Sequence, residues 1–64
     1  MTFREIRNSK GLTIKFVIEQ LSEKGIQLTD WQLNNRETNP KRFEPREIKA
    51  LCDIYQVDFN KVDF

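Results

Sequence analysis

The chain contains no histidine, a single cysteine and only two glycines among its 64 residues. One cysteine cannot form an internal disulfide, and a zinc site needs four ligands drawn mainly from cysteine and histidine. The chain therefore has neither of the two links that commonly stabilise a small domain. The lack of histidine removes the commonest general base, and two separated glycines do not build a phosphate-binding loop. We therefore expect no enzyme activity, no metal, no cofactor and no small-molecule substrate.

Long apolar runs are also absent. The longest is Phe16-Val17-Ile18, whereas a membrane span needs about 20 apolar residues. The N-terminus has no apolar core of the kind that a signal peptide needs. We expect a soluble, cytoplasmic protein that makes no membrane contact and forms a single domain over residues 1–64.

The net charge of +1 is unevenly distributed along the chain. Residues 1–42 hold eight Lys/Arg and five Asp/Glu, a net charge of +3, and residues 43–64 hold three and five, a net charge of −2. This asymmetry permits one basic and one acidic face, or two ordinary solvated surfaces.

The spacing of apolar residues predicts four or five short helices and no strand. We expect helices at 2–9, 13–24 and 30–37, a fourth from residue 44 or 45, and a short final turn capped by Asp58. The expected N-caps of the first three are Thr2, Thr13 and Thr29, while Gly11 and Gly25 suit the left-handed ends of the first two. Residues 38–45 are predicted to be a loop from which Phe43 returns to the core. The fold class is therefore all-α.

The helix at 30–37 is unusually polar. Leu33 is its only aliphatic residue and Trp31 its only aromatic residue. A polar helix in a small domain is either poorly anchored or contacts something polar.

The order of these elements resembles the Cro and phage-repressor type of helix-turn-helix DNA-binding domain, also called XRE-like. The resemblance covers nearly the whole chain, and it rests on Ile6-Arg7, Gly11-Leu12-Thr13, Leu21, Leu28 and Leu33, Glu37, and the tail Ile48, Leu51, Val57 and Val62. It implies a lambda-repressor-like domain of four or five helices in which the helix at 30–37 reads DNA. It also implies a regulator from a phage or another mobile element.

The resemblance further implies an ion pair between Arg7 and Glu37 that joins the first helix to the third. The alternative is that these are two unrelated surface charges. The chain departs from the family pattern in the turn at 22–28, which is about five residues longer than usual, and at Arg36, where an aliphatic residue is usual.

The proposed reading helix presents amide side chains, which can offer a donor and an acceptor together to an adenine edge. The expected base-contacting residues are Trp31, Gln32, Asn34 and Asn35. Three roles are open for Trp31. It packs in the core, it contacts the DNA backbone or a thymine methyl group, or it forms part of a surface that binds a partner. Asp30 either caps the helix or accepts from a cytosine amino group.

Phosphate contacts are expected from groups that flank this helix, and they would fix orientation without reading sequence. These groups are Lys15, Thr29, Arg36, Lys41 and Arg42. The alternative for each cation is an ordinary solvated side chain.

Helix-turn-helix proteins commonly bind two half-sites as dimers, and the resemblance implies a homodimer. We expect Tyr55, Phe59 and Phe64 at its interface, while Val57 and Val62 either join them or close the core of one chain. Cys52 falls on the apolar side of the fourth helix, where packing is the ordinary explanation.

The sequence thus predicts a small DNA-binding transcriptional regulator that acts by occupying a double-stranded operator. The alternative is a helix-turn-helix fold used to bind a protein, as in an antirepressor or small inhibitor. A basic rim around the third helix favours DNA, and an apolar patch centred on Trp31 favours a protein partner.

Overall fold

The computed structural model describes residues 1–63, which form four α-helices and two short 3-10 turns. Their order is α1 (Phe3–Ser9), α2 (Ile14–Glu23), α3 (Asp30–Glu37), η1 (Pro40–Arg42), α4 (Pro45–Tyr55) and η2 (Phe59–Lys61). No strand occurs within residues 1–63, so the all-α prediction is confirmed. The segment expected to be a plain loop, 38–45, is more ordered than predicted because it contains η1.

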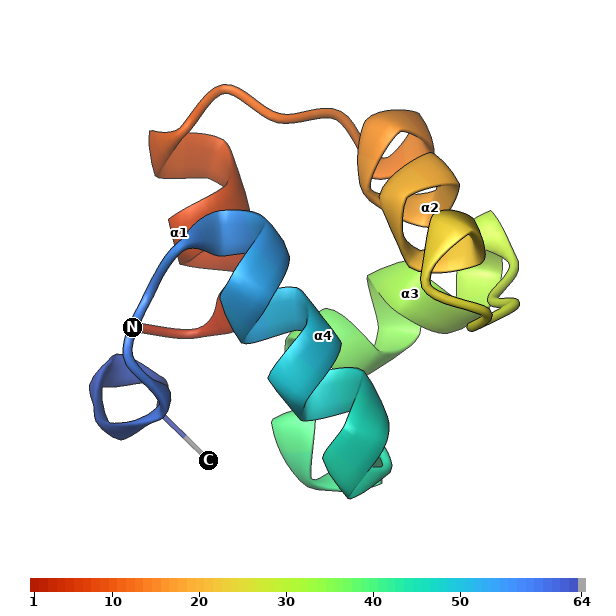
Figure 1. Ribbon diagram of the computed structural model, residues 1–64. Helices are drawn as coiled ribbons and strands as arrows, with labels where there is room; N and C mark the ends of the chain where they lie inside the picture. The colour runs from red at the N-terminus through yellow and green to blue at the C-terminus, as the bar shows by residue number, and fades with distance from the viewer. Residues whose placement is uncertain (64) are drawn as a thin grey trace.

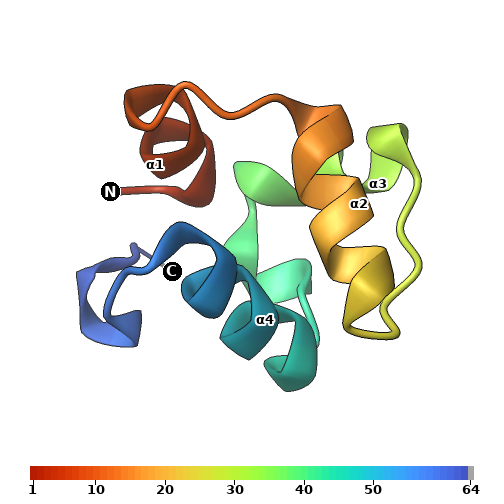
Figure 2. The same cartoon turned by 45° about the horizontal axis from the view of Figure 1, so that its top comes forward.

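The helices surround one core, and α4 runs across the middle of the view in Figure 1, with α1 and α2 above it on opposite sides. The helix α2 packs against both α3 and α4, and α3 also packs against α1 and η1. The second view shows the same pairing of α2 with α3 (Figure 2). The two ends of the described chain meet, because the Met1 amino group lies 2.9 Å from the Asp63 carboxylate.

The threonine caps begin the first three helices as predicted. The Thr2 hydroxyl accepts from the backbone N–H of Glu5, whose carboxylate accepts in turn from the backbone N–H of Thr2. Thr29 and Gln32 form the same reciprocal pair at the start of α3. Each pair satisfies backbone donors that have no partner inside the helix.

The turn between α2 and α3 is long, and its first residues tie it to the core. Gly25 has φ +83°, the N–H of Gly25 donates to the carbonyl of Ser22, and the N–H of Ile26 donates to the carbonyl of Leu21. This is a Schellman ending, in which a left-handed residue lets the chain reverse after the last turn. Ile26 is buried next to it, so the added length does not loosen the connection.

The core gathers apolar side chains from every helix. Phe3 meets Phe43 almost at right angles, with ring centroids 5.6 Å apart, and its centroid lies 6.0 Å from that of Tyr55. Phe43 therefore returns to the core as expected. The buried apolar residues are Phe3, Ile6, Val17, Leu21, Ile26, Leu33, Phe43, Ala50, Leu51, Cys52, Tyr55 and Val62.

The prediction that Tyr55 lies at a dimer interface is wrong. Its side chain has no exposed surface, because α4 directs it inward against Phe3. Val62 is also buried in this core, which favours core closure for that residue, whereas Val57 is half-buried. Phe64 lies outside the described residues.

We predict that Tyr55→Phe leaves the protein at least as stable near neutral pH and removes a loss of stability at alkaline pH. The Tyr55 hydroxyl oxygen finds no hydrogen-bond partner in the described part of the chain, so its removal leaves no group unsatisfied. Burial raises the pKa of Tyr55 well above its ordinary value, and the nearby Glu37 charge raises that pKa further. The folded chain therefore holds a proton that the unfolded chain loses above pH of about 10.

The free energy of unfolding of the wild type should accordingly fall as the pH rises past about 10. Urea unfolding at several pH values measures this fall, and tyrosinate absorbance follows the single tyrosine directly. Equal pH dependence in wild type and Tyr55→Phe would contradict the prediction.

Candidate nucleic-acid interface

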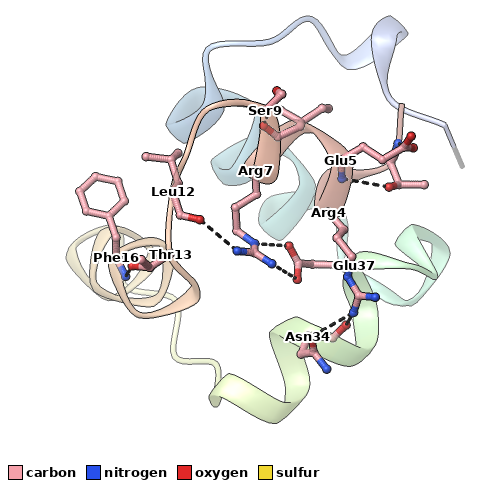
Figure 3. Close-up of polar contacts among 11 residues, drawn as sticks. Arg4, Glu5, Arg7, Ser9, Leu12, Thr13, Phe16, Asn34 and Glu37 are labelled. Atoms are coloured by element: carbon pink, nitrogen blue, oxygen red, sulfur yellow. Dashed lines mark hydrogen bonds and ion pairs between the residues drawn. The ribbon is translucent and has the colours of Figure 1, made fainter.

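The polar helix α3 is anchored to α1 by a buried ion pair. The Arg7 Nε lies 2.6 Å from Glu37 Oε2, and Arg7 Nη2 lies 3.4 Å from Glu37 Oε1 (Figure 3). The side chain of Glu37 is 0% exposed and that of Arg7 is 12% exposed. The pair implied by the family resemblance is therefore present, in the two-pronged geometry that suits a guanidinium and a carboxylate.

Arg7 also reaches the turn between α1 and α2. Its Nη1 donates to the carbonyl of Leu12 at 3.0 Å, as Figure 3 shows. One guanidinium thus connects α1, the α1–α2 turn and α3. Burying a carboxylate costs free energy unless it is paired and hydrogen-bonded. The buried Glu37 is therefore compatible only with folded arrangements in which Arg7 stays paired with it.

A second ion pair joins α3 to the start of α4, and sequence reasoning missed it. Arg36 Nη1 lies 3.3 Å from Oε1 of Glu47, which is 5% exposed. The same oxygen accepts from the backbone N–H of Glu44 at 2.9 Å, so the acid also caps α4. The unusual arginine at position 36 was visible in the sequence, but its partner 11 residues away had no local signal.

A third contact holds the outer edge of α3. Arg4 Nη2 donates to Asn34 Oδ1 at 2.9 Å and to the Asn34 carbonyl at 3.0 Å (Figure 3). Polar contacts from α1 and α4 therefore supplement the one buried aliphatic side chain of α3, Leu33. These contacts fix which side of the helix faces outward.

The outward side of α3 is centred on Trp31 and Asn35, which are one helical turn apart. Trp31 is 72% exposed, so the core placement considered for it is wrong. A pocket of about 180 Å³ opens beside these residues, between α3 and η1, and it is lined by Trp31, Gln32, Asn35, Arg36 and Arg42.

Two of the predicted base-contacting residues are already engaged within the chain. The side-chain oxygen of Gln32 accepts from the Thr29 N–H, and that of Asn34 accepts from Arg4. Bidentate recognition of adenine needs the amide oxygen as an acceptor. Gln32 and Asn34 would have to share that oxygen with Thr29 and Arg4 in order to contact a base.

The predicted phosphate-contacting residues lie around α3 in different environments. Lys15 is exposed in the first turn of α2, and Lys41 and Arg42 are exposed in η1. Arg36 is half-buried against Glu47, so part of its charge is neutralised. The exposed acid Asp30 interrupts the basic rim at the start of α3.

The predicted dimer residue Phe59 is 55% exposed and borders a separate groove. This groove has a volume of about 500 Å³ and lies between α4 and η2, lined by Pro45, Ile48, Lys49, Cys52, Asp53, Val57, Asp58 and Phe59. Burial raises the pKa of the Cys52 thiol, and the charges of Asp53 and Asp58 raise it further. The thiol is therefore held protonated, which lowers its reactivity.

Within residues 1–63, no group of three or more cysteine, histidine or acidic side chains is placed to hold a metal ion. None of the helices in this part of the chain has both the length and the apolar character needed to cross a membrane.

Comparisons with known proteins found no matching protein-family model, no matching curated protein and no matching solved structure.

We predict that Arg7→Ala lowers the free energy of unfolding by about 3–5 kcal/mol, because it leaves the Glu37 carboxylate buried and unpaired. Urea unfolding measures the change, with Arg46→Ala as a matched control. Arg46 pairs with Glu44 at 3.2 Å, but both side chains are more than 60% exposed, so that loss should be below about 1 kcal/mol. Equal losses in the two variants would show that the buried pair does not anchor α3.

Proposed function

We propose that this protein is a small sequence-specific DNA-binding transcriptional regulator in which α2 and α3 act as a helix-turn-helix of the lambda-repressor type. The observation that carries the proposal is the outward side of α3, where Trp31 and Asn35 stand beside Arg42. That side is held in a fixed orientation by the Arg7–Glu37 and Arg36–Glu47 ion pairs.

The dimensions of α3 suit the major groove of B-DNA. Eight residues make a helix about 12 Å long, and the groove admits one α-helix. Asn35, in the second turn of α3, offers an amide to a base edge. Lys15, Lys41 and Arg42 are exposed on the flanking elements α2 and η1, where they can meet phosphates of the two strands.

The proposed mechanism is occupancy of an operator. A protein that covers a specific duplex site obstructs polymerase or a competing DNA-binding protein there. The long α2–α3 turn is compatible with this role because Ile26 anchors it to the core and leaves the cap of α3 intact.

We predict that a random duplex library yields an enriched sequence motif, and that Asn35→Ala weakens binding to it by about 5- to 150-fold. This range corresponds to the roughly 1–3 kcal/mol of one good side-chain contact with a base. Fluorescence anisotropy measures the affinity, and Asn60→Ala in η2 is the matched control. The absence of any enriched motif would refute the proposal, and a motif indifferent to Asn35→Ala would refute α3 as the reading element.

Binding to two half-sites would require a homodimer, and the groove beside Phe59 is the proposed contact surface. It combines an apolar lining with one cation, Lys49, and two acids, Asp53 and Asp58. In a twofold contact each surface meets its own copy, so Lys49 of one protomer can face an acid of the other. Half-sites would then lie about 34–36 Å apart on one side of the duplex.

We predict that Phe59→Ser shifts the protein from dimer to monomer, because it removes an exposed aromatic group from this surface. Analytical ultracentrifugation over a range of concentrations measures the mass. The control Phe16→Ser removes another exposed aromatic side chain, 41% exposed on α2, and should leave the dimer intact. A wild type that is monomeric throughout would contradict the dimer but not DNA binding.

A second proposal, a protein-binding module, is favoured by the exposure of Trp31. A protein hot spot commonly contains such an indole within an apolar surround. Here the other side chains that line its pocket are amides and arginines, which suit a polyanion better. Specific binding to a protein without any enriched DNA motif would make this second proposal the correct one.

A further inference from the structure

The pocket between α3 and η1 has two chemically different sides. Trp31 supplies a large apolar wall that is 72% exposed, and Arg42 supplies a cation from the neighbouring element η1. Its volume of about 180 Å³ limits a ligand to one small group. A ligand for this pocket should therefore carry an apolar group and an anion close together.

We infer that this pocket receives a thymine nucleotide of the bound duplex, with the thymine methyl group on the Trp31 indole and a backbone phosphate on Arg42. The inference rests on the proposed function and deepens it, because it names a base that the protein reads and the residue that reads it. Trp31 becomes a specificity-determining residue that uses no hydrogen bond.

The chemistry of the major groove selects thymine. Among the four bases, only thymine presents an apolar group there, its C5-methyl, whereas the other bases present hydrogen-bond donors and acceptors. An exposed indole gains stability by burying apolar surface. Contact with the thymine methyl buries apolar surface on both partners, and contact with a polar base edge does not.

The charges around the pocket place the phosphate on the η1 side. Arg36 is partly neutralised by Glu47, so Arg42 is the stronger cation of the two that line the pocket. The exposed Asp30 carboxylate at the start of α3 repels phosphate. A guanidinium can meet two phosphate oxygens at once, which would fix the nucleotide against the indole.

The test uses the duplex enriched from the random library, with each thymine replaced in turn by deoxyuracil. This change removes the methyl group and leaves the hydrogen-bonding edge intact. For the wild type, one replacement in a single half-site should weaken binding by about three- to five-fold, the value of one buried methyl group. For Trp31→Ala, the same replacement should have no effect.

Two variants separate this contact from the others. Asn35→Ala should bind more weakly but stay sensitive to the same deoxyuracil, because the Trp31 indole that meets the methyl group is unchanged. Arg42→Ala should lower the slope of log K against log salt concentration by about 1, and Lys61→Ala in η2 should leave the slope unchanged. Circular dichroism checks that each variant is folded, which the exposure of Trp31, Arg42 and Lys61 favours.

The outcomes separate the thymine contact from DNA recognition as a whole. Binding that is indifferent to deoxyuracil at every position, or equally sensitive in wild type and Trp31→Ala, overturns the thymine contact while DNA recognition stands. An enriched motif without thymine overturns it as well. A library without any enriched sequence overturns DNA recognition and the thymine contact together.

Discussion

The Glu37 carboxylate, fully buried at the end of α3, is the constraint on which the rest of the structure depends. A charge removed from water is stable only when it is paired and hydrogen-bonded, and Arg7 satisfies it with two nitrogen atoms. Because Arg7 also donates to the Leu12 carbonyl, the same guanidinium sets the direction of the chain between α1 and α2. Three segments are positioned by one pair.

This constraint explains how so polar a helix can be part of a small core. Leu33 is the only buried aliphatic residue of α3, and the helix is held in addition through Glu37, Arg36 and Asn34 by charged or polar side chains of α1 and α4. Such contacts are directional, so they define the rotation of the helix more narrowly than apolar packing does. The outward side can then carry Trp31, which lies outside the core, and the amide of Asn35.

The proposed roles use different faces of the molecule. The pocket beside Trp31 lies between α3 and η1, and the groove beside Phe59 lies between α4 and η2. The first has two arginines and no acid in its lining, while the second has two acids and one lysine. The split of charge along the sequence, +3 before residue 43 and −2 after it, therefore corresponds to two surfaces of different chemistry.

The sequence by itself determined the helices, because caps and stops are local. Thr2, Thr13 and Thr29 accept from N–H groups three residues ahead, and Gly11 and Gly25 take the positive φ that ends a helix. The end of α4 had no such signal, since Gln56 takes φ +54° there without being glycine. Apart from the Arg7–Glu37 pair, which the family resemblance implied, only the tertiary structure decided the long-range contacts. The Arg36–Glu47 pair, the inward turn of Tyr55 and the engagement of Gln32 and Asn34 depend on which side of each helix meets its neighbours, and that is a property of packing rather than of any one segment.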